Sequence, residues 1–195
     1  KKAAEAACIR GRLYAGGGED ADTLGWISCE AAAGKLNSLR DKAQEVYKQA
    51  DVLVVVGVGG SNQAARAVIE ALPHGGPVIL YAGNTLSPFD LSRVLDQIKG
   101  KNVYLHVIAK NFETLEPGSH YRVLRSFLKK WYTPGQMAER VVITGTENTR
   151  LHEIARENGH LFLPFPKDIG GRYSAFSPVV LFPLASAGLD ILASL

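Results

Sequence analysis

Asp51-Val52-Leu53-Val54-Val55-Val56-Gly57-Val58-Gly59-Gly60-Ser61 is the stretch that decides the fold of this chain. Residues 51–56 form an apolar, β-branched run, as in a parallel strand that helices cover on both faces. The closely spaced glycines that follow predict a tight turn. A helix comes next, because apolar residues recur with helical spacing at Ala65, Val68, Ile69 and Leu72.

The same alternation of strand and helix continues along the chain. Ser87-Pro88 offers an N-cap followed by proline at the first helical position. Strands alternating with helices predict an α/β fold: a doubly wound, five-stranded parallel sheet flanked by helices, in a flavodoxin-like three-layer sandwich. We expect further strands at 77–81, 103–108, 140–143 and 160–163, and helices near 31–50, 87–98, 124–131, 151–155 and 178–195.

Composition limits the class of protein. The chain has 195 residues, 46% hydrophobic and 21% charged, which is ordinary for a globular domain. A net charge of +3, without a basic run interleaved with aromatics, argues against nucleic acid as a partner. Cys8 and Cys29 lack a metal-like spacing, which indicates reduced thiols and a cytoplasmic location.

The two ends of the chain give further expectations. The first residues show no apolar segment and no cleavage site, so we expect no secretion signal. The apolar stretch 178–195 contains Pro183, Gly188 and Asp190 and barely reaches the ~20 residues of a membrane span. We therefore expect a buried helix and no membrane association. Because the chain stops inside this pattern, we also consider it one part of a longer protein.

Three loops suited to an anionic ligand each follow a predicted strand. They are Gly57–Ser61, Lys110–Thr114 and Gly170–Ser174. In an open parallel sheet, the loops that leave the carboxyl ends of the strands share one edge, and ligands bind in the crevice there. The three loops together predict a site for a small anion, held by backbone amides, hydroxyls and a fixed cation.

The first glycine turn allows two interpretations. Asn62 stands where a dinucleotide fingerprint needs its third glycine, and the second strand ends at Tyr81 and Ala82 without an acidic residue. No Gly-Lys-Ser/Thr sequence for a nucleoside triphosphate follows. The turn is either a structural connection with Ser61 as helix N-cap, or an anion site at a helix N-terminus; both can hold together.

Several segments resemble, in order, the sugar-isomerase domain of the phosphoglucose isomerase family. The resemblance covers the chain from about Leu24 onward. It assigns residues 51–195 to the sugar-isomerase domain, preceded by a helical lead-in at 1–50. The matching segments are Leu24-Gly25-Trp26, Val56–Ser61 with Ala65-Arg66-Ala67, Ala82-Gly83-Asn84, Lys110 through Pro117, and Asp168-Ile169-Gly170-Gly171-Arg172-Tyr173-Ser174, which resembles a family signature.

The family resemblance implies an activity and a set of roles. Such enzymes interconvert glucose 6-phosphate and fructose 6-phosphate through an enediolate, without a metal or organic cofactor, and the full-length protein is expected to be a homodimer. Gly60 and Ser61 would lie against the sugar-phosphate substrate. Arg172, with the Gly171 amide beside it, would face the enediolate, where a permanently charged guanidinium lowers the barrier. The phosphate-holding loop would contain Lys110, Asn111 and Thr114.

The phosphate-holding loop departs from the family pattern. Ala109 and Asn111 stand where hydroxyl residues are usual, and Glu113 replaces a threonine. Fewer hydroxyl donors weaken anion binding, and a carboxylate opposes it unless it is paired, for example with Lys110. The phosphate site is therefore expected to be rebuilt, relaxed or retuned for another sugar phosphate.

The proton-transferring glutamate, ring-opening histidine and late lysine of the family are expected from a second domain that this chain lacks. Structural roles are expected for its histidines, which are His74, His106, His120, His152 and His160.

Two alternatives stay open. One is a non-catalytic regulatory module that binds a sugar phosphate on the same fold. The other is a different aldose–ketose isomerase whose active site another subunit completes.

Overall fold

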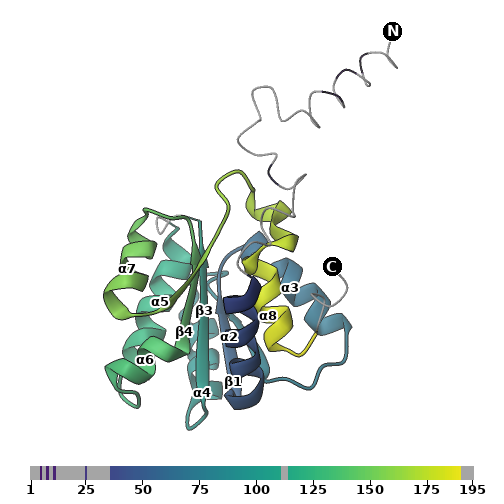
Figure 1. The fold of residues 1–195 in the computed structure, drawn as a ribbon. Helices are drawn as coiled ribbons and strands as arrows, with labels where there is room; N and C mark the ends of the chain where they lie inside the picture. Colours follow the sequence, from purple (N-terminus) through teal and green to yellow (C-terminus); the bar gives the residue numbers. More distant parts are fainter. Residues whose placement is uncertain are drawn as a thin grey trace.

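A computed structural model describes residues 36–110 and 114–189, together with Glu5, Cys8, Gly11 and Gly25 (Figure 1). Its centre is a five-stranded sheet with the order β2-β1-β3-β4-β5, and every neighbouring pair is parallel. The predicted strands are thereby confirmed. Their bounds are β1 Val52–Val56, β2 Val78–Ala82, β3 Val103–Ala109, β4 Val141–Gly145 and β5 Leu161–Pro164.

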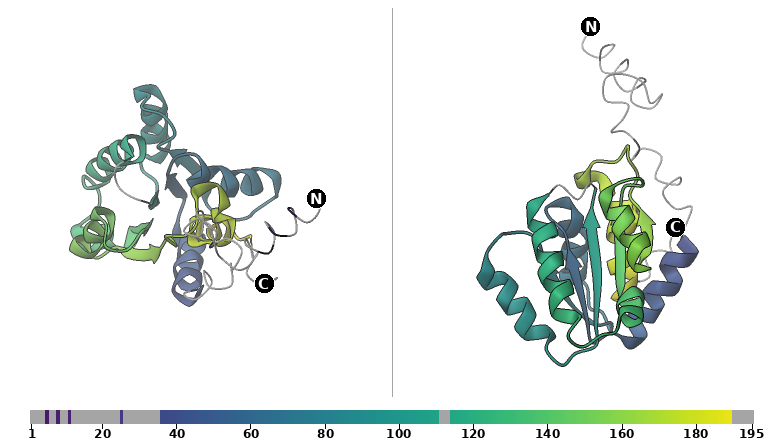
Figure 2. Two further views of the ribbon diagram at one scale, coloured as in Figure 1. Left: turned by 90° about the horizontal axis from the view of Figure 1, so that it is seen from above. Right: turned by 90° about the vertical axis from the view of Figure 1, so that its left-hand side faces the viewer.

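Helices cover both faces of the sheet (Figure 2). On one face lie α2 (Leu36–Gln49), α3 (Gly60–Ala71) and α8 (Pro178–Ser186). The other face carries α4 (Pro88–Ile98), α5 (Leu115–Leu128), α6 (Pro134–Arg140) and α7 (Arg150–Asn158). A short 3₁₀ helix, η3 (Gly171–Phe176), precedes α8.

Strand β1 shows why the apolar run was informative. Leu53 and Val55 enter the core on the α2/α3/α8 face, while Val52, Val54 and Val56 enter the core on the opposite face. All five residues are buried, because alternate side chains of a central strand point to opposite faces. The doubly wound three-layer architecture is confirmed.

Two helices form as their sequence signals predict. Ser87 caps α4: its hydroxyl accepts a hydrogen bond from the Asp90 amide, and Pro88 begins the helix. The buried helix expected from residue 178 is α8, which packs against α2, α3 and β1. Eight of its nine residues are buried, so its sequence carries no polar stripe. Residues 190–195 lie outside the described part of the chain.

Two local features differ from expectation. Helix α6 was not predicted, although a capping box marks its start: Thr133 and Gln136 bond each other's backbone amides, with Pro134 at the first position. The helix predicted near 124–131 extends too far at its C-terminal end. The helix ends at Leu128, and Trp131 follows in a turn with 45% of its surface exposed.

The strand order determines where a ligand crevice can form. The chain leaves β1 to one side for β2 and then crosses to the other side for β3. The loops after β1 and β3 therefore diverge at the topological switch point, where ligands of open α/β sheets bind. These are the loops that carry Gly57–Ser61 and Lys110–Thr114. No helix within the described residues is long and apolar enough to cross a membrane.

Candidate active site at the carboxyl edge of the sheet

The glycine turn after β1 leads directly into α3. Gly59 has a φ of 58° and is the N-cap, so the proposed N-cap role of Ser61 is wrong. Ser61 lies in the first helical turn instead, and its amide donates to the Val58 carbonyl at 3.1 Å. A positive φ favours glycine at position 59. The Ser61 hydroxyl and the positive end of the α3 dipole thus both lie at the switch point.

A close backbone approach joins this turn to η3. A β-carbon on Gly60 would lie 2.2 Å from the Gly171 carbonyl oxygen and 2.9 Å from the Arg172 amide nitrogen. Only a glycine at position 60 therefore permits the observed packing. The structure thus brings together four of the expected site residues, which are Gly60, Ser61, Gly171 and Arg172.

The backbone that carries Arg172 is held by its own hydrogen bonds. The buried Ser174 donates its hydroxyl to the Gly171 carbonyl at 2.8 Å. Ser177 then donates its hydroxyl to the Ser174 carbonyl at 2.7 Å and also caps α8. The Arg172 side chain is exposed on this fixed turn. These bonds hold the backbone at position 172, from which the arginine side chain extends at the edge of the sheet.

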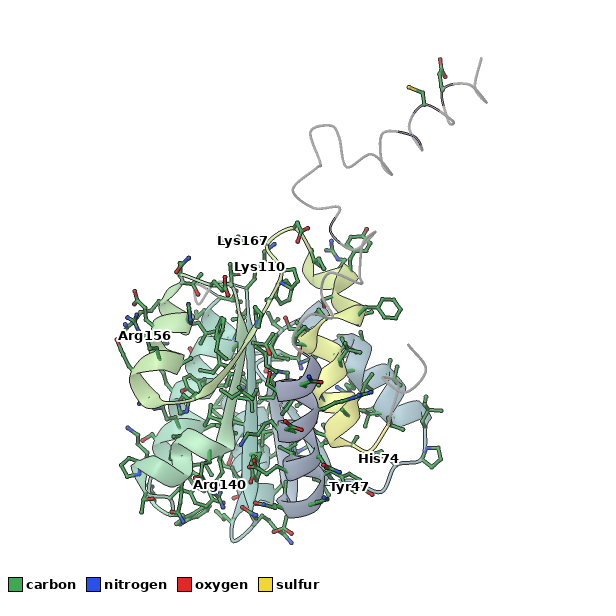
Figure 3. The ribbon with its side chains drawn as sticks, in the orientation of Figure 1. Tyr47, His74, Lys110, Arg140, Arg156 and Lys167 are labelled. Carbon is green, nitrogen blue, oxygen red and sulfur yellow. The ribbon has the colours of Figure 1, made fainter. Side chains whose placement is uncertain are left out.

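Lys110 directly follows β3 and contacts the loop that leads into η3. Its ammonium donates to the Lys167 carbonyl at 2.6 Å and to the Ile169 carbonyl at 3.2 Å, and it lies 5.9 Å from the centre of the Phe165 ring. Figure 3 shows Lys110 and Lys167 close together at the top of the sheet. Lys110 thus links the end of β3 to the loop that precedes Gly170 and η3.

The remainder of the predicted phosphate-holding loop is described only in part. Thr114 is the N-cap of α5. Asn111 and Glu113 lie outside the described residues, and with them the suggested Glu113–Lys110 pair. A phosphate-binding role for Lys110, Asn111 and Thr114 stays a prediction. Upstream, the Gly25 amide donates to the Asp168 carbonyl at 2.9 Å, which places Gly25 beside the Gly170–Ser174 segment.

A hydrogen-bond network beneath the glycine turn was not predicted. The fully buried Asn62 donates from Nδ2 to the Gly57 carbonyl at 2.8 Å and to Asn84 Oδ1 at 3.0 Å. The network fixes the loop after β1 against the loop after β2. Asn62 stood out in the sequence only as the residue that breaks the dinucleotide fingerprint.

His120 holds the loop after β2 from the other side. Its Nδ1 accepts a hydrogen bond from the Gly83 amide at 2.9 Å, and Gly83 has a φ of 87°. Burial lowers the pKa of His120, against an opposing contribution from the Asp90 charge. The neutral ring is therefore the form that accepts this bond. A cavity of about 510 Å³ between β2, α3 and α4 is lined in part by Asn84 and His120.

Structural roles fit two further histidines. His106 is fully buried on β3, where Nε2 bonds the Thr144 hydroxyl at 2.8 Å, and burial lowers its pKa to about 3. His160 is buried beside Tyr121, and burial lowers its pKa as well. Across residues 36–110 and 114–189, no group of three or more His, Cys, Asp or Glu side chains is placed to bind a metal ion.

Comparison with known proteins agrees with this architecture. A glucose-6-phosphate isomerase of Exiguobacterium sibiricum is 33% identical over 94% of this chain and 44% of its own length. The enzyme of the same name from Shouchella clausii is 36% identical over 89% of this chain and 42% of its own. The chain thus spans less than half the length of these curated relatives.

Solved structures share the fold. A hypothetical protein of Thermus thermophilus superposes with a TM-score of 0.83 at 28% identity, over 95% of this chain and 45% of that one. A glucose-6-phosphate isomerase of Chlamydia trachomatis gives 0.67 at 23% identity, over 77% of this chain and 29% of that one.

The parallel sheet, its strand order and the loops at its switch point define an α/β domain of the sugar-isomerase type. Within that class the assignment is specific. The model of the phosphoglucose isomerase family matches residues 35–195, and the chain belongs to this family.

Proposed function

We propose that this chain is the part of a glucose-6-phosphate isomerase that binds the phosphate of the substrate and stabilises the enediolate. Membership of the family supports the reaction class. The observation that carries the assignment of roles is the packing of Gly60 against Gly171 and Arg172. It sets the first turn of α3 beside the backbone of Arg172 at one edge of the sheet.

The phosphate end of the substrate belongs at the start of α3. Backbone amides and the helix dipole favour an anion at this position, and the Ser61 hydroxyl adds a donor. Lys110, Asn111 and Thr114 leave the neighbouring β3 on the other side of the switch point. A phosphate held there would contact both loops.

The reacting carbons belong near Arg172. Removal of the C2 proton from the open-chain form of glucose 6-phosphate turns the C1 carbonyl oxygen into an enediolate oxygen. Return of that proton to C1, with transfer of the C2 hydroxyl proton to the C1 oxygen, gives the ketose. Negative charge develops on oxygen in this step, so a preorganised guanidinium lowers the energy of the transition state. The Gly171 amide would supply a second donor. We propose that the base comes from the part of the relatives that this chain does not span.

Kinetics of the complete protein tests this assignment. A coupled assay with fructose 6-phosphate is expected to show isomerase turnover. Arg172→Ala is expected to lower kcat about 10²-fold or more with a smaller change in KM, because the lost interaction forms mainly in the transition state. Lys99→Ala, at the exposed end of α4, is the matched control for loss of one cation.

Calorimetry with 6-phosphogluconate separates this function from the regulatory alternative. Binding of the ligand without any turnover by the complete protein would assign the chain to a regulatory module. An Arg172→Ala variant with unchanged kcat would remove Arg172 from the chemistry.

A further inference from the structure

A second cationic site lies away from the switch point, between α5 and α7. These helices lie side by side on the face that carries α6 (Figure 1). A cavity of about 370 Å³ opens between them, here called the α5–α7 cleft. Four of its lining residues are cationic: Arg122 and Arg125 from α5, Lys129 at the C-cap of α5, and Arg150 from α7. Ser126 adds a hydroxyl, and among the described residues no carboxylate lines the cleft.

The cations of α5 form one stripe. Arg122, Arg125 and Lys129 are spaced i, i+3 and i+7, and Ser126 falls at i+4, so all four face the cleft together. Like charges three and four residues apart repel one another and reduce helix stability. The sequence keeps three such charges on one stripe, and a bound anion would relieve their repulsion.

Two of the guanidinium groups are held in place before any ligand binds. Arg125 donates to Oδ1 of Asn158, whose Nδ2 in turn donates to the Ile154 carbonyl at 2.8 Å, so the guanidinium bridges α5 and α7. Arg150 bonds Glu153 and Glu157, each at 3.0 Å. Both carboxylates lie outside the lining of the cleft. Fixed guanidinium groups lose less freedom on binding an anion than mobile ones.

The positive potential of this region acts on a neighbouring buried group. His160 lines an adjoining cavity of about 380 Å³, together with Arg125 and Lys129. Burial lowers the pKa of His160; a backbone hydrogen bond at Ala138 opposes this, and the charge of Arg125 lowers the pKa further. An anion bound beside Arg125 would cancel part of that contribution.

We propose that the α5–α7 cleft binds a small metabolite that carries two phosphate groups. Guanidinium forks match phosphate oxygens in pairs, and the cleft gathers cations from two helices, so that two phosphate groups can be held at once. The volume suits a small molecule. Tyr121 and Ile154 form a less polar part of the cleft wall between the cations. The part of the ligand that links its two phosphate groups can lie against them. The lining shares no residue with the site at the switch point, so the proposal is independent of the isomerase function.

Isothermal titration with pyrophosphate tests the proposal, with the chain in metal-free buffer. We expect saturable binding of one pyrophosphate to the cleft, weakened by added NaCl. The double variant Arg125→Gln/Lys129→Gln should bind about tenfold more weakly or worse, since it loses two charge-assisted contacts. Lys99→Gln/Lys101→Gln removes the same charge from a distant surface and should bind like the parent. Arg172→Ala should also bind normally, which separates this site from the switch point.

An NMR titration of the His160 ring needs no variant. Saturating pyrophosphate is expected to raise its pKa, because the anion opposes the field of Arg125. The proposal is overturned by any of four results: no saturable binding, equal weakening in the Lys99/Lys101 control, loss of binding in Arg172→Ala, or an unmoved His160 pKa at saturation. Orthophosphate that binds as tightly as pyrophosphate would refute the two-phosphate requirement. An oligonucleotide that displaces pyrophosphate at lower concentration would assign the cleft to nucleic acid instead.

Discussion

The backbone of Gly60 packs directly against the carbonyl of Gly171, which lies 111 residues later in the sequence. A β-carbon at position 60 would lie 2.2 Å from that carbonyl oxygen, so there is no room for one. This contact connects the first turn of α3 to the turn that carries Arg172. The relative position of the proposed phosphate-binding and oxyanion-binding elements therefore depends on the absence of a side chain at position 60.

Gly60→Ala is expected to separate the two elements. The added methyl group meets backbone that cannot rotate away, so the free energy of unfolding should fall by about 2 kcal/mol or more, and Arg172 should move. Gly135→Ala is the matched control, since nothing lies within 4 Å of its β-carbon position in α6. Urea unfolding of both variants checks this. Equal stability of the two would show that the Gly60–Gly171 contact is easily relaxed.

Asn62→Leu is expected to destabilise the loops beneath the site. The change keeps the branched shape of the side chain but removes both donated bonds and leaves the Gly57 carbonyl without its side-chain partner. The loss should be about 2 kcal/mol, typical of a buried unsatisfied group. Asn84→Ala removes only one of the two bonds, at a less buried position, and should cost less. Chemical denaturation measures both, and the reverse order would contradict the network as described.

Lys110→Met is expected to loosen the loop before η3. The exposed ammonium adds little to global stability, but it is bonded to the Lys167 and Ile169 carbonyls. Amide hydrogen exchange across 166–172 should therefore quicken. Lys167→Met is a sharp control, because Lys167 takes part in this contact only through its backbone. Identical exchange in both variants would mean that the ammonium does not hold the loop.

Stability is expected to fall below neutral pH because of His106. Its pKa is lowered to about 3 in the folded protein, whereas the unfolded chain takes up the proton near the ordinary value of 6.5. The contribution is present above pH 6.5 and is lost progressively toward pH 3, with about 2 kcal/mol lost between pH 7 and pH 5. His120 and His160 act in the same direction.

Urea titrations at the two pH values test this dependence. His106→Asn removes the titrating group and should reduce the pH dependence of stability. His74→Asn changes an exposed position and should leave the pH dependence of stability unchanged. An undiminished pH dependence in His106→Asn would exclude His106 as its main source.

The strands could be predicted because each buried strand has a strong local signal. The apolar run of β1 predicts a strand without reference to the neighbouring strands. The cap of α4 is visible in four consecutive residues, from Ser87 to Asp90. Helix α6 was not predicted because its seven residues are too few to show the helical periodicity of apolar residues. The end of α5 was predicted too late, at residue 131 and not at Leu128, because apolar spacing does not show where a helix ends.

The candidate site was predictable only in outline. A shared edge follows from the parallel sheet, but the contact of Gly60 with Gly171 does not, because chain segments far apart in sequence make it. The hydrogen bond from the Lys110 ammonium to the Lys167 carbonyl joins residues 57 positions apart, so local sequence does not predict it either. Asn62 and His120 gave no local signal either, since their partners belong to other loops.

The position of α8 has a consequence for synthesis on the ribosome. This helix fills the space between α2, α3 and β1, although more than a hundred residues separate it from β1. Until residue 186 has left the exit tunnel, the cover of this face of the sheet is incomplete, and the nascent chain exposes apolar surface to water and to chaperones. The hydrophobic layer formed by the earliest strand can close only late in translation.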